Sequence, residues 1–286
     1  MTYYANYTTL DALKHQYLDI TVDSSGNAIT VDDALLSALI RDTSRTIERS
    51  AQRTFAPRLE TKKFDMPLLT EQALLFDDDL LSLTSLINGD GTVLSTVTDF
   101  VLYPYNERVK TKALLIPVSA VTWQPSATLA TYSAISVAGV WGYAKDGDWI
   151  SSGGVLTAAI TTANATTFTA TKNKILEGWL IQIDSEWLYV TGVASGVSDD
   201  QVTCVRGVNG STAATHLIST AISYWQPDYD IEMLARMAAA AAYRIRANPT
   251  GDTVVIDGTS FATPKDISVF IWNRLGALGY RRVVIG

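Results

Sequence analysis

Short apolar segments, each bounded by turn residues, fill the middle of this 286-residue chain and limit what it can fold into. From Leu59 to Gln226 the apolar runs have the length of strands rather than of helices. Asn88-Gly89-Asp90-Gly91 separates two of these runs, and Asn-Gly and Asp-Gly accept the positive φ angles of a hairpin turn. Apolar alternation also stops at Asp184-Ser185 and resumes at Trp187, which predicts a second tight hairpin, and Val208-Asn209-Gly210-Ser211 offers a further turn. The middle of the chain is therefore expected to be rich in β-strands.

Helical periodicity is concentrated near the two ends of the chain. Val31 to Phe55 has the strongest pattern, because two aspartates favour its N-terminal dipole and one apolar stripe follows. That stripe consists of Leu35, Leu36, Leu39, Ile40, Thr43, Ile47 and Ala51. A second helix is expected from Asp228 to Ala247, where an alanine tract would permit close approach of a neighbouring element. A shorter one is expected from Thr9 to Leu18.

The order of these segments predicts an α+β fold with an insertion. Residues 1–146 and 226–286 are expected to form a helical core with a small β-sheet. The composition shifts toward Thr, Ser, Gly and Ala in residues 147–225, which are expected to form a β-rich domain resembling a barrel or a sandwich. Gly139 and Gly142, inside an expected strand, indicate a bulge or a close backbone approach.

The charge and composition exclude several classes of protein. A net charge of −7 disfavours a dedicated nucleic-acid-binding protein, since phosphate contacts require clustered Lys and Arg. The single cysteine excludes an internal disulfide and favours folding in a reducing cytoplasm. No apolar run approaches the ~20 residues of a membrane-spanning helix. Only 18% of the residues are charged, which suits a surface that is buried against partners.

No arrangement of residues predicts catalysis or a cofactor. The two histidines, His15 and His216, lie far apart in the sequence, and no zinc-ligand, nucleophile-elbow or phosphate-loop motif is present. Cys204 could pair with His216, but its alternating position in an expected strand favours a buried core thiol. The chain is therefore predicted not to be an enzyme and to bind no cofactor.

Two sets of carboxylates have the composition of candidate functional sites. Asp77, Asp78 and Asp79, with Asp90, could supply oxygen ligands to a hard cation, but adjacent residues of an extended chain point to opposite faces. A solvated turn is the favoured interpretation of that run. Asp184 and Glu186 could form a glycosidase pair, but a charged hairpin tip is favoured because nothing marks a sugar cleft around them.

Aromatic residues of the expected insertion allow two interpretations. They could form a stacking platform for a carbohydrate, or they could fill the core of a small β domain, and the core is favoured because two of them lie in apolar strands. These residues are Trp149, Phe168, Trp179, Trp187 and Tyr189.

A basic row follows the first long helix. Arg41, Arg45, Arg49 and Arg53 lie four residues apart, so they are expected to share one helix face. A solvated face paired with Asp42 and Glu48 is the simpler interpretation. The alternative is a contact with an acidic surface of a neighbouring subunit.

Several segments together resemble the head-tail connector adaptor proteins of tailed bacteriophages. The resemblance covers roughly residues 5–145 and 226–286, and its motifs are structural patterns of moderate specificity. The segments are Asp33 to Ile40, Ser44 to Glu48, Arg53-Thr54-Phe55, Asp79 to Leu86 with Asn88 to Gly91, Tyr103-Pro104, and the helix ending Tyr243-Arg244-Ile245-Arg246. Residues 147–225 depart from a minimal adaptor, and Trp179 to Val190 with Val205 to His216 resemble a small β module of phage structural proteins.

The resemblance implies a subunit of the virion neck that is made in the host cytoplasm. Such subunits form a ring, commonly of twelve copies, under the portal protein. The ring extends the DNA channel toward the stopper or tail-completion protein, and DNA passes through it without sequence-specific binding. A ring built by heterologous contacts needs two complementary faces. The basic row and the acidic run, Asp77 to Asp79, are the candidates for those faces.

The C-terminal tail is the candidate for docking to the portal. Tyr280, Arg281, Arg282, Val283, Val284 and Ile285 are apolar, β-branched or basic, and such a segment can add as a strand to an exposed sheet edge. A terminal strand of the chain's own fold is the competing interpretation. For the whole chain, the main competitor is a tail or baseplate protein whose β domain binds host polysaccharide.

Overall fold

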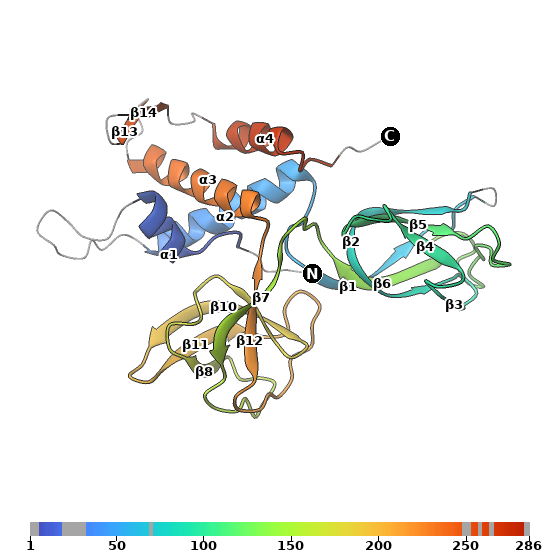
Figure 1. Ribbon diagram of the computed structural model, residues 1–286, viewed down its shortest axis with the longest axis horizontal. Coiled ribbons are helices and arrows are strands. Elements are labelled where there is room, and N and C mark those ends of the chain that lie inside the picture. Colours follow the sequence, from blue (N-terminus) through green and yellow to red (C-terminus); the bar gives the residue numbers. More distant parts are fainter. Residues whose placement is uncertain are drawn as a thin grey trace, which may run out of the picture. The chain divides into compact units, whose positions relative to one another are not determined.

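A computed structural model describes residues 6–18, 33–68, 71–247, 253–256, 259–262 and 266–282 of the chain (Figure 1). The chain divides into two compact units. One consists of residues 1–52 with 146–286, and the other of residues 53–145. The sequence-based boundaries at residues 146 and 226 remain a prediction.

The unit formed by residues 53–145 is a six-stranded antiparallel sheet in the order β1-β6-β2-β5-β4, with β3 paired to β2. Its strands are β1 (Arg58–Phe64), β2 (Ala73–Ile87), β3 (Val93–Leu94), β4 (Phe100–Tyr103), β5 (Lys110–Leu115) and β6 (Ile135–Trp141). Strand β2 is irregular at several points along its length, and it pairs with β5 near its start and with β6 toward its end. Phe64, Phe76 and Trp141 meet in the core between these strands.

Glycine is required where β6 passes β2. A Cβ atom at Gly139 would lie 2.3 Å from the Ser82 carbonyl oxygen, a distance that no side chain tolerates. The sequence-based prediction of a close backbone approach at Gly139 is therefore confirmed.

Residues 148–226 form the second six-stranded antiparallel sheet, in the order β7-β12-β9-β10-β11-β8. Its strands are β7 (Asp148–Val155), β8 (Thr167–Thr171), β9 (Leu180–Ile183), β10 (Glu186–Ser195), β11 (Asp199–Val205) and β12 (Ala221–Gln226). The two outer strands meet beyond the end of β7, where Leu156 bridges to Ala170 and the Thr157 amide donates to the Thr169 carbonyl at 3.0 Å. The sheet thus closes on itself around an apolar interior (Figure 1). We call this closed sheet the barrel.

The turns of the barrel are the ones that the sequence predicts. Ile183 pairs with Glu186 across Asp184-Ser185, and Asp184 has a φ of 53°. In the turn from Val208 to Ser211, the Ser211 amide donates to the Val208 carbonyl at 3.0 Å. Both predicted turns are confirmed.

The helices belong to the same unit as the barrel. They are α1 (Leu10–Leu13), the π-helix η1 (Lys14–Leu18), α2 (Asp33–Ala51), α3 (Tyr229–Ala247) and α4 (Ile267–Ala277), and β13 (Thr253–Ile256) pairs with β14 (Thr259–Ala262). The helices α2, α3 and α4 pack side by side (Figure 1). Leu36 and Ile40 of α2 pack with Ala239 and Ala240 of α3. The small alanine side chains thus allow the close helix approach that the sequence predicts.

The predicted fold class, a helical core with a small sheet, is wrong. Two antiparallel six-stranded sheets dominate, and only 23% of the described residues are helical. The sequence also suggested a turn between two short segments at Asp77 to Asp79. The structure carries one continuous 15-residue strand, β2, through these aspartates. Basic side chains beside them neutralise their charge, so the chain can remain extended there.

Candidate functional site

The basic row does not form one continuous face. Arg45 is paired with Glu48 at 2.8 Å, and the Arg49 guanidinium donates to the Thr46 hydroxyl at 3.1 Å. Arg53 lies beyond the end of α2, in the unit of residues 53–145, where its Nε is 3.4 Å from Asp79 Oδ2. Arg53 therefore lies outside the helix that carries Arg41, Arg45 and Arg49.

The acidic run is paired with basic groups of its own unit. Asp78 contacts Arg58 and lies 3.1 Å from Lys62 Nζ, while Asp77 lies 3.5 Å from the same lysine. Burial alone would raise the pKa of Asp78, but the charges of Arg58 and Lys62 and the backbone amide of Asp79 hold that pKa below its usual value. Asp77 is the one aspartate of the three with an exposed side chain, at 72%.

The described part of the C-terminal tail is fixed against the helices. Tyr280 is 2% exposed, and its hydroxyl lies 3.4 Å from Asp230 Oδ2 on α3. The Arg282 amide donates to the Ala51 carbonyl, at the end of α2, at 3.0 Å. Val283, Val284 and Ile285 lie outside the described residues.

The barrel contains a buried ion pair that sequence reasoning missed. Glu186 is fully buried at the start of β10, and Arg206 follows β11. The Arg206 Nε donates to Glu186 Oε1 at 2.6 Å and Nη2 donates to Oε2 at 2.5 Å, so the contact is bidentate. The sequence placed Glu186 at a charged hairpin tip, whereas the side chain points into the barrel.

Further donors complete the surroundings of Glu186. The amides of Gly207 and Ala214 donate to its two oxygens at 3.1 and 3.0 Å, and His216 Nε2 lies 2.8 Å from Oε2. Burial alone would raise the pKa of Glu186, but the hydrogen bonds from Arg206, Ala214 and His216 and the charge of Arg206 lower it below its usual value. We call Glu186, Arg206 and His216 the barrel triad.

His216 is also bound to Asp184. Its Nδ1 lies 2.8 Å from Asp184 Oδ2, so a carboxylate faces each ring nitrogen. A carboxylate only accepts hydrogen bonds, so each ring nitrogen of His216 faces an acceptor. The groups considered as a glycosidase pair, Asp184 and Glu186, thus hold His216 between them and join the loop of residues 206–216 to the β9–β10 hairpin.

Cys204 is a core thiol, as the sequence predicts. It is 3% exposed, and burial raises the pKa of its thiol to about 11. A neutral, buried thiol is a poor nucleophile.

The aromatic residues of the barrel mostly cover one another. Phe168 and Trp187 are buried, and Trp149 packs 5.3 Å from Trp187 between ring centroids. The Trp179 ring is stacked on Tyr224, with centroids 4.0 Å apart and planes inclined by 6°. The sequence-based preference for a core role is confirmed for Phe168, which belongs to the barrel core, and Trp179 packs against that core, while Trp187 is buried beside Trp149.

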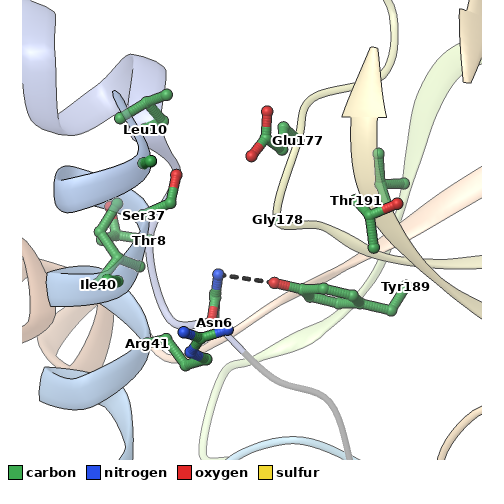
Figure 2. Close-up of a pocket in the computed structure, with 13 residues that line it drawn as sticks. Asn6, Thr8, Leu10, Ser37, Ile40, Arg41, Glu177, Gly178, Tyr189 and Thr191 are labelled. Atoms are coloured by element: carbon green, nitrogen blue, oxygen red, sulfur yellow. Dashed lines mark hydrogen bonds between the residues drawn. The ribbon is translucent and has the colours of Figure 1, made fainter. Parts of the chain in front are cut away.

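A cavity of about 230 Å³ lies between α2 and the barrel (Figure 2). Beside it, the side-chain amide of Asn6 donates through Nδ2 to the Tyr189 hydroxyl at 2.9 Å. Arg41 and Glu177 contribute opposite charges to its wall. Arg41 thus lies at the wall of this cavity.

Among the residues that the structure describes, no group of three or more His, Cys, Asp or Glu side chains is arranged to hold a metal ion. Within the same residues, no helix combines the length and the apolar character needed to cross a membrane.

Comparison of the sequence with known proteins gives no family. No protein-family model matches it, and no curated protein matches it.

Proposed function

We propose that this chain is a structural subunit of the head-to-tail connector of a tailed bacteriophage. In this role its copies form a ring under the portal protein, and the ring extends the DNA channel toward the stopper or tail. DNA passes through the ring without sequence-specific binding. The sequence resemblance supports the proposal, and the observation that carries it is an exposed apolar surface in the unit of residues 53–145.

Three large apolar side chains form this surface, which we call the apolar patch. Leu68, Leu129 and Tyr132 are 70%, 54% and 71% exposed. They lie on two segments joined by hydrogen bonds, because the Met66 amide donates to the Thr131 carbonyl at 2.7 Å and the Ser133 amide donates to Asp65 Oδ1 at 2.8 Å. Large exposed apolar side chains on neighbouring segments are typical of surfaces that bind other proteins.

The state of the reactive groups agrees with a structural role. Glu186, Arg206 and His216 bind one another, and Cys204 is buried in the barrel core. These are the groups that a nucleophilic or acid-base mechanism would use, and each has a structural task. A role based on contacts with other proteins needs no reactive group.

The competing function, a tail or baseplate protein that binds polysaccharide, would require open aromatic faces on the barrel. Trp179 is stacked face to face on Tyr224, and Trp187 is buried. A sugar ring would have to displace these contacts in order to stack on either tryptophan. We therefore favour the connector role.

Binding to purified portal rings tests the proposal. We expect the chain to bind them, and replacement of Leu129 and Tyr132 by serine to weaken that binding. Val197→Ser is the matched control, because Val197 is 98% exposed but belongs to the barrel. If the chain does not bind portal rings, the proposal is contradicted. If the double change leaves the binding unaffected, the role of the apolar patch is contradicted.

The docking role of the tail needs a separate variant. Removal of residues 280–286 would also remove the buried Tyr280 ring, so loss of binding could reflect unfolding. A chain that ends at Arg282 keeps Tyr280 and the hydrogen bond from the Arg282 amide to Ala51. We expect this shorter chain to bind portal more weakly, and undiminished binding would refute docking by the tail.

A further inference from the structure

Arg281 lies at the surface with its guanidinium over an aromatic ring. Its guanidinium carbon lies 4.4 Å from the centroid of the Trp272 ring, on α4. On another side the guanidinium approaches Gly276, where an added Cβ atom would lie 2.7 Å from Nη2. The aromatic ring and the bare glycine backbone together fix the plane of the guanidinium.

The neighbours of Arg281 fix its backbone as well. Helix α4 ends in a turn in which Gly279 has a φ of 74° and the Tyr280 amide donates to the Leu275 carbonyl at 3.0 Å. Tyr280 is buried, and the Arg282 amide is bound to the Ala51 carbonyl. Arg281 therefore extends from a segment that is anchored on both sides.

The hydrogen-bond donors of Arg281 are unused by the part of the chain that the structure describes. Among the residues that the structure describes, no carboxylate, carbonyl or hydroxyl accepts a hydrogen bond from its guanidinium. The N–H groups of a guanidinium lie in its own plane, so stacking of one face on a ring leaves them available to a planar acceptor.

A pocket of about 430 Å³ opens beside this guanidinium. It is lined by Ser50, Gln52, Trp272, Gly276, Gly279, Arg281 and Arg282. Two cations and two neutral polar side chains thus line it, and of the described residues no Asp or Glu does so. The lining has the charge and the donors to receive an anion.

We propose that this pocket binds a carboxylate of an acidic protein segment, with Arg281 as its bidentate donor. A guanidinium and a carboxylate match in geometry and form two parallel hydrogen bonds. A net charge of −7 disfavours attraction of a nucleic acid, while it provides each further copy of the chain with acidic segments. The proposal does not depend on the connector role, because the site would serve any acidic protein partner.

Binding of a fluorescent hexaglutamate peptide to the full chain, followed by anisotropy at low salt, tests the site. We expect R281A to weaken binding about tenfold or more, as for loss of a charge-assisted bidentate contact. R281K keeps the charge but loses the planar fork, so it should also bind more weakly than the wild-type chain. R246A is the matched control, since Arg246 is an exposed arginine in the last turn of α3.

Equal affinities of R281A and R246A would overturn the proposal, provided that both variants have the circular dichroism spectrum of the wild-type chain. Tighter Arg281-dependent binding of a short DNA duplex than of hexaglutamate would overturn it as well.

Sedimentation of the wild-type chain and R281A identifies the source of the carboxylate. Weaker self-association of R281A would support a second copy as the partner, and unchanged self-association with retained peptide binding would support a different protein. Neither sedimentation result depends on whether the apolar patch binds portal.

Discussion

The Arg206 guanidinium and the Glu186 carboxylate form a bidentate ion pair inside the barrel, with Glu186 fully buried. Glu186 also accepts hydrogen bonds from two backbone amides of the loop that follows β11. This one side chain therefore joins β10 to a long loop that has no regular secondary structure.

Replacement of Glu186 by glutamine should destabilise the barrel strongly. The variant leaves the Arg206 charge buried without its counter-ion, and loss of one partner of a buried ion pair costs about 3–5 kcal/mol. Urea denaturation followed by tryptophan fluorescence measures the change. Asp184→Asn is the control, because the Asp184 side chain is 59% exposed, and it should cost less than about 1 kcal/mol. Equal effects of the two changes would show that the barrel triad is not a stabilising centre.

Acid should destabilise the chain, in part through Glu186 and Asp78. The pKa of each is lower in the folded chain than its usual value, so the unfolded chain binds protons more readily. Their stabilising contribution is complete above the usual carboxyl pKa values of about 4, and it is lost as the pH falls through the lower folded values. Urea midpoints between pH 7 and pH 3 at constant ionic strength should fall, and they should fall less steeply in E186Q. An identical pH dependence in E186Q would contradict the contribution of Glu186.

Arg53 and Arg49 both belong to the basic row in the sequence, but we expect their replacement by alanine to lower the free energy of unfolding by different amounts. Arg53 lies beside the buried carboxylate of Asp79 and over the Tyr143 ring, with 4.0 Å from its guanidinium carbon to the ring centroid. Arg53→Ala should therefore cost about 3 kcal/mol of the free energy of unfolding. Arg49 is exposed on α2, so Arg49→Ala should cost less than about 0.5 kcal/mol. Chemical denaturation of both variants tests this, and a similar small effect of the two would refute the structural role of Arg53.

Cys204 should be nearly inert in the folded chain. A thiol whose pKa rises from 9.0 to about 11 has a thiolate fraction about a hundredfold smaller at pH 8, and burial adds a steric barrier. Alkylation by iodoacetamide at pH 8, followed by mass spectrometry, should be slower in buffer than in urea by at least about a hundredfold. Similar rates in the two conditions would indicate that the barrel opens readily.

The sequence by itself determined the local elements of this protein. The apolar stripe of α2, the hairpin at Asp184-Ser185 and the turn at Val208 to Ser211 were predictable, because each depends on residues within a few positions of one another. The burial of Cys204 was also predictable, since it follows from alternation along one strand.

Only the tertiary structure decided the fold class and the partners of the charged residues. Arg206 and His216 lie 20 and 30 positions after Glu186 in the sequence, and the register of the barrel strands brings the three residues together. In the same way, β2 continues through Asp77 to Asp79 because Arg58 and Lys62 of β1 lie beside them. Local patterns give the length and the faces of an element, but they contain no information on which distant element will neutralise its charges. That choice is made when the strands pair, because each register buries a different set of side chains.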